Sequence, residues 1–530
     1  MIKKLVSVIL SALFILSLFT ACKSREEKRR EALEELYGND GIITDKQDEE
    51  EDEDSAGSIP TTFALPYSGE DSFNPYLCTT TINNTVCDLV FDSLVKVNQD
   101  YTITLSMAKS VSIEGSNIVV ELAPSLLFSD GSAVTVYDIV YSCNSARLNQ
   151  NSHFYNQLAS IIDCRQDGHK VYFTLSSPDC MADRLLDFPI IKRNSDTIFG
   201  VTPIGSGRYK FAKDNTGTYL ALNPNWYGYS ALSIAKIRLL EMPTLESIIY
   251  SVEIGTLSFF FSDLSENNFT NINAISNMVD LNNLVFLGIN TNNGLLSQPE
   301  IRTAISCALD RDSLAIKAYT GRALAATGPF TPNWDKAQEY QKNSTSAQKS
   351  KAESYLDSAG YVNVDQSGIR YNGNGRKLEF KLLISSENPN RSTCAQLIQQ
   401  QLAAVGISVT IQTTTYEKFV AAVEAGNYQM YLGEYPVKSN MDISDLIGTE
   451  DAKYTYYHGS VPYTLQKSIK EWRQGTGDVK DIFELFDRTL PFIPVVYRQG
   501  LAIYTRTLKG SLVSTESDLF LNLSEWSMGG

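Results

Sequence analysis

The chain has 530 residues, too many for one simple hydrophobic core, so two or three domains are expected. Its 43% hydrophobic and 20% charged residues are ordinary for a globular protein. The net charge of −16 argues against nucleic acid as a partner, because surfaces that bind nucleic acid are basic.

The N-terminal segment, residues 1–21, is typical of a signal peptide. Two lysines precede an apolar run of 15 residues, 5–19, and this run is short for a transmembrane helix, which needs about 20. An Ala-Cys pair at Cys22 then resembles a bacterial lipobox, although Phe19 stands where leucine is usual. We expect the Cys22 thiol to be lipidated. An ordinary cleaved signal and an uncleaved anchor are the alternatives.

The next segment, residues 22–57, is strongly acidic. From residue 23 onward it holds 14 acidic and 6 basic residues, including an unbroken acidic run at 48–54. Such a segment repels itself and buries little surface. It is therefore expected to be a solvated linker between the lipid and the folded body. An acidic tail that binds a ligand is the alternative.

The rest of the chain alternates predicted strands and helices. In chain order they are a strand at 118–122, a helix opened by Thr135 and Asp138, a strand at 171–175, a helix at 299–309, a helix ending at Gly406, a strand at 407–411 and a helix ending at Gly426. These assignments follow from apolar periodicity and from capping residues. Helix–glycine–strand units of this kind predict an α/β chain.

Catalytic signatures are absent from the sequence. It has no GxSxG, HExxH or GxxxxGK[ST] motif. The three histidines, His153, His169 and His458, are not spaced as metal ligands. We therefore expect a binding protein rather than an enzyme, with no cofactor and no metal. A surface enzyme acting on peptides or glycans is the alternative, and it would need a nucleophile or metal cluster.

Nine segments, taken in order, resemble one family. They are 73–95, 127–141, 202–210, 223–228, 288–291, 301–311, 352–361, 406–407 and 491–497. The most specific is Leu127-Phe-Ser-Asp-Gly131 with Thr135, Asp138 and Tyr141, which is similar to the pattern F-x-D-G-x-x-x-T-x-x-D-x-x-Y-S. The chain thus resembles the extracellular solute-binding proteins of peptide-type ABC importers.

This resemblance implies a two-lobed α/β fold, like that of periplasmic binding proteins, with a hinged cleft for the ligand. Residues 58–285 would form lobe 1 with an inserted subdomain at about 96–200. Residues 286–492 would form lobe 2, and 493–530 would return to lobe 1. Hinge crossings would lie near 288–290 and near Pro491. The two lobes would close around the ligand by hinge motion.

The resemblance also implies a function. A monomer on the outer face of the bacterial cytoplasmic membrane would capture oligopeptides or a related small solute and deliver it to ABC permease subunits. The alternatives are a non-peptide solute, such as an anion, a metal chelate or an oligosaccharide, and a ligand-sensing lipoprotein.

Eight residues are carried over as candidate ligand contacts: Asn74, Arg391, Tyr416, Glu434, Tyr435, Lys438, Asn440 and Asp442. Peptide-binding relatives have an aspartate where this chain has Lys438, and that aspartate pairs with the amine of the peptide. A lysine in the cleft would repel an ammonium group and attract an anion. Asp442 or Glu434 could replace the missing carboxylate, and Arg391 could bind a ligand carboxylate. Alternatively, Lys438 is a solvated surface residue.

Overall fold

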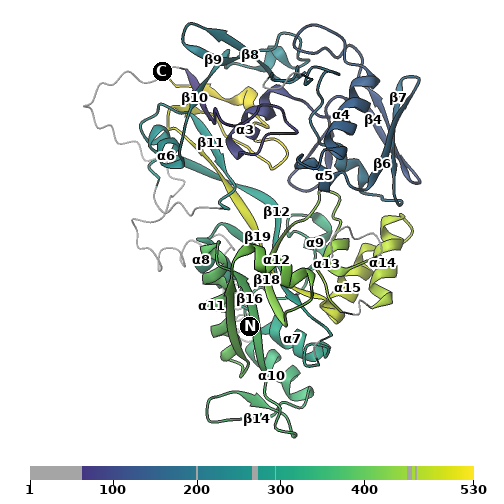
Figure 1. The fold of residues 1–530 in the computed structure, drawn as a ribbon, viewed down its shortest axis with the longest axis vertical. Helices are drawn as coiled ribbons and strands as arrows, with labels where there is room; N and C mark the ends of the chain where they lie inside the picture. The colour runs from purple at the N-terminus through teal and green to yellow at the C-terminus, as the bar shows by residue number, and fades with distance from the viewer. Residues whose placement is uncertain are drawn as a thin grey trace, which may run out of the picture.

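A computed structural model describes residues 62–197, 201–265, 272–292, 294–449, 456–459 and 462–529. The predicted signal peptide, Cys22 and the acidic linker at 22–57 lie outside the described residues. Within them, the chain forms two lobes, the upper and lower halves of Figure 1. We define lobe 1 as the described residues of 62–283 and 501–529 and lobe 2 as those of 284–497, because the main hydrophobic cores separate along this line.

Lobe 1 contains two four-stranded sheets with helices packed around them. The first sheet has the order β1-β10-β9-β8, and the second has the order β4-β5-β7-β6. The strands are β1 (Phe63–Tyr67), β4 (Ala108–Glu114), β5 (Asn117–Leu122), β6 (Ile161–Asp167), β7 (Lys170–Leu175), β8 (Tyr209–Asp214), β9 (Gly217–Leu222) and β10 (Lys236–Glu241). The helices are α3 (Thr81–Val90), α4 (Val136–Leu148), α5 (Phe154–Gln157) and α6 (Leu245–Glu253). The C-terminal segment, yellow in Figure 1, lies in this lobe and contributes Trp526 to its core.

Local chemistry explains why several of these elements begin where they do. The predicted helix at Thr135 is confirmed as α4, and the backbone N–H of Thr135 donates to Asp138 Oδ2 at 2.9 Å. Such reciprocal capping satisfies donors that the first turn would otherwise leave unpaired. The strands predicted at 118–122 and 171–175 are confirmed within β5 and β7, which pair with each other.

Lobe 2 is built on most of a seven-stranded sheet that extends into lobe 1 through β11 and the ends of β12 and β19; its order is β11-β19-β12-β18-β16-β17, and β13 pairs with β19. The strands are β11 (Phe259–Ser262), β12 (Ile275–Ile289), β13 (Ala323–Ala325), β16 (Glu379–Ser385), β17 (Ser408–Thr414), β18 (Met430–Pro436) and β19 (Phe492–Tyr504). The helices are α7 (Pro299–Ala308), α8 (Arg311–Tyr319), α9 (Asp335–Tyr340), α10 (Lys349–Ser358), α11 (Pro389–Ala403), α12 (Tyr416–Glu424), α13 (Ser444–Ile447), α14 (Tyr463–Arg473) and α15 (Val479–Thr489). The predicted helix–glycine–strand unit is confirmed as α11, Gly406 and β17, and Gly406 has the positive φ of +84° that ends a helix.

Short two-stranded sheets complete the fold. They pair β2 (Val95–Val97) with β3 (Ile103–Leu105), β14 (Asn363–Val364) with β15 (Arg370–Tyr371), and β20 (Leu508–Lys509) with β21 (Ser527–Met528). Among the described residues, no helix combines the length and apolar character needed to cross a membrane.

Two long antiparallel strands, β12 and β19, run through both lobes (Figure 1). One end of the pair lies beside β11 in lobe 1, and the other lies beside β18 in lobe 2. Their ladder is interrupted between Asp280 and Leu284, so that residues 281–283 bulge out of register. A bulge re-aims side chains and loosens the ladder at one point. Here that point lies where the chain passes from one lobe to the other.

Candidate ligand-binding site

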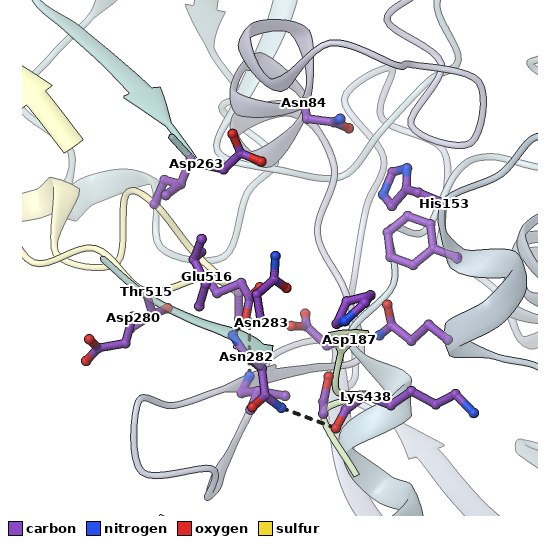
Figure 2. Close-up of a pocket in the computed structure, with 18 of the residues that line it drawn as sticks. Asn84, His153, Asp187, Asp263, Asp280, Asn282, Asn283, Lys438, Thr515 and Glu516 are labelled. Atoms are coloured by element: carbon purple, nitrogen blue, oxygen red, sulfur yellow. Dashed lines mark hydrogen bonds between the residues drawn. The ribbon is translucent and has the colours of Figure 1, made fainter. Parts of the chain in front are cut away.

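A cavity of about 650 Å³ lies between the lobes. This volume is within the range of small-molecule sites, about 300–1,000 Å³. Lobe 1 contributes α3, the β12 bulge and the loop at 514–519, and lobe 2 contributes the end of β18 and the residues after it. Figure 2 shows Asn282 and Asn283 of the bulge beside Glu516 in this cavity. The break in the β12 ladder therefore carries two amide side chains into the wall of the cavity.

Carboxylates dominate the lobe 1 wall. Asp187 accepts hydrogen bonds from Ser93 Oγ at 3.0 Å and from the Ser517 hydroxyl, and it lies 3.8 Å from Lys96 Nζ. Burial raises the pKa of the Asp187 carboxyl, because desolvation disfavours the charged form. Burial likewise raises the pKa of Asp88 to about 7, although Lys96 opposes this shift.

Glu516 extends from the C-terminal loop into the cavity. It accepts the backbone N–H of Asn282 through Oε2 at 3.1 Å, and its side chain is exposed to the cavity between the lobes. Burial raises the pKa of this carboxyl to about 7, and repulsion from Asp187 and Asp280 adds to the shift. The amide N–H bond acts in the opposite direction but is the smaller effect.

The lobe 2 wall contains two of the predicted site residues. Tyr435 lines the cavity and donates its hydroxyl to Asp445 Oδ2 at 2.9 Å. Lys438 also lines the cavity, but its Nζ lies 3.1 Å from Asp442 Oδ2. Arg473 and Lys438 outweigh burial and hold the pKa of Asp442 below its usual value. The Lys438 side chain extends away from Asn282 in Figure 2. Its charge is therefore balanced by Asp442 and does not face the cavity alone.

Arg391 and Glu434 meet in an ion-pair network behind the cavity wall. The Glu434 carboxylate is 3.1 Å from Arg391 Nη2 and 2.6 Å from Arg498 Nε. It also accepts a hydrogen bond from Asn283 Nδ2 at 3.2 Å. Neither Arg391 nor Glu434 is among the described residues that line the cavity. The network instead fixes Asn283, which does line it.

Three further candidates lie apart from the cavity lining. Tyr416 is 54% exposed at the start of α12. Asn440 is buried and donates to Asp179 Oδ2 at 2.7 Å. Asn74 is buried in a turn, where its Oδ1 accepts the N–H of Tyr76 at 3.0 Å.

The Asp179–Asn440 bond belongs to a buried contact that joins the lobes outside the cavity. Asp179 of lobe 1 is 2.6 Å from Arg473 Nη2 of lobe 2, and Cys180 N donates to Arg473 O at 2.7 Å. Met181 of the same segment packs into a lobe 2 core cluster. We call the Asp179, Asn440 and Arg473 contact the interlobe clasp.

The sequence matches a family model described as "Bacterial extracellular solute-binding proteins, family 5 Middle" over residues 102–447. The chain belongs to this family. It is 22% identical to the oligopeptide-binding protein AppA of Bacillus subtilis (strain 168), over 99% of each chain. It is also 22% identical to the glutathione-binding protein GsiB of Pectobacterium atrosepticum, over 67% of this chain and 69% of that protein.

Solved structures of similar proteins share the fold of this family 5 protein. A nickel ABC transporter structure from Bacillus halodurans gives a TM-score of 0.73 at 18% identity, covering 88% of this chain and 99% of that chain. AppA from Bacillus subtilis in complex with a nonapeptide gives a TM-score of 0.58 at 19% identity, covering 89% and 100%. The two-lobed fold class predicted from the sequence is confirmed.

Sequence reasoning missed most of the cavity wall in this solute-binding protein. The candidates did not include Asp88, Asp187, Asn282 or Glu516, because the resemblance to the family drew attention to lobe 2. One signal was present: the Asn282-Asn283 pair stands between Leu281 and the apolar run that begins at Leu284. A polar pair in such a strand indicates a bulge or a functional position. Glu516 had no such signal, because only the tertiary fold brings the C-terminal loop to the cavity.

The cavity holds groups suited to binding, and they do not form a nucleophile–base pair. His153 lines it, but burial lowers the pKa of this imidazole to about 4, so it is neutral at pH 7. Within the described ranges, no group of three or more His, Cys, Asp or Glu residues is placed to hold a metal ion. The arrangement provides fixed hydrogen-bonding groups and charge around an enclosed space, as expected of a solute site.

Proposed function

We propose that this protein is the extracytoplasmic solute-binding component of an ABC importer, and that it captures a peptide or a related small solute between its lobes. The cavity of about 650 Å³ at the junction of two lobes that share β12 and β19 carries this proposal. Relatives named as oligopeptide- and glutathione-binding proteins support it. The function requires reversible binding and closure, with no covalent chemistry.

Tyr435 and Lys438 are proposed to contact the solute directly, since both line the cavity. Arg391 and Glu434 are proposed to act indirectly by positioning Asn283. Asn440 and Asp442 are placed to affect closure, through the interlobe clasp and through Lys438.

Peripheral roles remain for Asn74, which would hold the turn before α3, and for Tyr416 at the surface of lobe 2. The resemblance gives the lobe boundaries as 285/286 and 492/493, and the packing of Ile493 and Val496 in the lobe 2 core supports a later second boundary. The bulge at 281–283 supports a hinge slightly earlier in β12.

The attachment and partners belong to the same proposal. Cys22 would carry the lipid, and residues 22–57 would tether a monomer to the outer face of the cytoplasmic membrane, next to its permease. The sequence of the N-terminal segment supports this arrangement. Family members bind and release solutes, so a catalytic role is not proposed.

Native mass spectrometry of protein purified from its own cells tests the capture of a solute. We expect a co-purified small molecule at one copy per chain. A peptide in that position would support the peptide part of the proposal. A defined non-peptide solute would contradict the peptide part of the proposal. The absence of any bound solute, together with no thermal shift across a broad solute panel, would contradict solute capture itself.

A further inference from the structure

Negative charge prevails on the cavity wall. Its described lining contains six carboxylate residues and two lysines: Asp88, Asp187, Asp263, Asp280, Asp445 and Glu516, with Lys96 and Lys438. Both lysines already have carboxylate neighbours, Lys96 with Asp187 and Lys438 with Asp442. Among the described residues, no basic side chain forms an ion pair with Asp88, Asp280 or Glu516. Several carboxylates therefore line the cavity without an ion-pair partner in contact in the described part of the chain, and Lys96 and Arg498 only partly offset the charge of Asp88 and Glu516.

Glu516 is the best placed of these carboxylates. Its Oε2 accepts one hydrogen bond, from Asn282 N, and the side chain is open to the cavity. A carboxylate can accept about four hydrogen bonds, so Glu516 has acceptor capacity left for a ligand. In Figure 2 it lies next to Asn283.

A second group beside Glu516 also lacks a donor. Asn282 is 96% buried, and its Oδ1 has no hydrogen-bond partner among the described residues. Its Nδ2 donates to the carbonyl oxygen of Lys438 at 3.4 Å, which fixes the orientation of the amide. A buried acceptor without a donor is costly and calls for an explanation. A ligand that brings N–H donors to this point would supply one.

Resting on the proposed function, we propose that the cavity selects solutes carrying an ammonium or guanidinium group, and that Glu516 and the adjacent Asn282 receive that group on the lobe 1 wall. An ammonium supplies three donors and a guanidinium five, and neither accepts a hydrogen bond. Both match a wall that offers acceptors. An added carboxylate or phosphate would face like charges at short range.

The proposal places the cation site away from position 438. There, Lys438 repels an ammonium group less than an unpaired lysine would, because Asp442 balances its charge. The wall opposite supplies the negative charge instead. A peptide with a cationic side chain, a free amine such as spermidine and an amino sugar all carry the required group, and they differ in the rest of their chemistry.

Protonation gives this site a pH dependence. Without a bound cation, burial and the neighbouring Asp187 and Asp280 keep the pKa of Glu516 at about 7. The Arg498 charge lowers the pKa of Glu516, and Lys96 lies 3.8 Å from its neighbour Asp187. A cation binds the ionised carboxylate, so affinity should rise as pH increases from about 5.5 to 7.5 and then level off.

Matched pairs of solutes test the proposal on the mature full-length chain. Isothermal titration calorimetry would compare N-acetyl-Ala-Lys-Ala with N-acetyl-Ala-norleucine-Ala, so that only the lysine peptide carries an ammonium group, then glucosamine with glucose, and finally spermidine alone. We expect the cationic member of at least one pair to bind 10-fold tighter or more, since a charge-assisted hydrogen bond is at stake. Glu516→Gln should reduce that preference to less than threefold. Glu246→Gln, on exposed α6 and away from the cavity, should leave it unchanged.

The outcomes distinguish failure of the cation site from failure of solute capture. If both members of every pair bind equally, or if Glu516→Gln keeps the preference, the cation site is wrong while solute capture stands. If no solute of the panel binds to either protein and no small molecule co-purifies with the chain, solute capture fails, and the cation site fails with it. Circular dichroism of both variants checks that they are folded.

Discussion

The interlobe clasp predicts a large and specific cost for removing Arg473. In Arg473→Met, the Asp179 carboxylate loses its partner at 2.6 Å and keeps the amide of Asn440 at 2.7 Å. The Asp179 and Arg473 side chains are only 3% and 10% exposed, so water cannot replace the lost partner. Breaking a buried pair from one side costs about 3–5 kcal/mol. We expect a loss in this range for the free energy of unfolding at pH 7.

The charge of Asp179 sets how this cost depends on pH. Burial raises the pKa of the carboxyl above its usual value, even with Arg473 and Asn440 opposing the shift. Without Arg473 the pKa of Asp179 rises further, so a lower pH favours the protonated form. The cost should therefore be smaller at pH 5 and larger at pH 8, where ionisation of Asp179 is forced.

Urea denaturation and small-angle scattering measure the two consequences. The urea midpoint should fall in Arg473→Met, and the radius of gyration without ligand should increase, because the clasp joins the lobes. Adding Asp179→Asn to Arg473→Met should recover at least half of the stability, since the remaining amide pair carries no charge.

Arg488→Met is the matched control. Arg488 is 72% exposed and lies 3.9 Å from Glu484 within α15. Exposed pairs of this kind contribute about 0–1 kcal/mol. A midpoint for Arg473→Met no lower than that of Arg488→Met would refute the reasoning, because Asp179 could not then be buried against lobe 2.

Three further predictions follow from the anchor, the cavity and the network behind it. Cys22→Ser should abolish incorporation of labelled palmitate into the chain and leave the longer precursor, and labelling that persists in this variant would rule out Cys22 as the lipid site. Without ligand, stability should fall as pH rises from about 4.5 to about 7 as Glu516 is forced to ionise in the fold, and Glu516→Gln should flatten that part of a plot of melting temperature against pH. Glu434→Gln should cost about 3 kcal/mol in urea denaturation, because it leaves Arg391 and Arg498 without their shared carboxylate, and a cost below about 1 kcal/mol would mean that the network is solvated.

The sequence predicted local elements well where local chemistry decides them. The cap at Thr135 and Asp138 and the turn at Gly406 each depend on residues within a few positions of one another. The nine family-like segments led to the correct fold class in the same way, because each of them is short and could be recognised from adjacent residues. These features need no knowledge of what packs against them.

The cavity wall could not be predicted in this way, because its residues meet only in the folded chain. Glu516 bonds to Asn282 across 234 positions, and Asp179 meets Arg473 across 294. Lys438 illustrates a different failure. Its partner Asp442 is four residues away, so the ion pair could be inferred from spacing, but Asp442 was interpreted as a replacement ligand carboxylate and not as the partner of Lys438.

The bulge in β12 places recognition and movement in the same three residues. Residues 281–283 form the flaw in the ladder that both lobes share, and they also touch the space where a solute would lie. A solute in this cavity would contact the bulge at 281–283 directly. Its binding would therefore act on the hinge without intermediate residues. Natural selection on solute preference at Asn282 or Asn283 would therefore also change how readily the protein closes. Affinity for the solute and closure of the lobes around it would therefore evolve together in this protein.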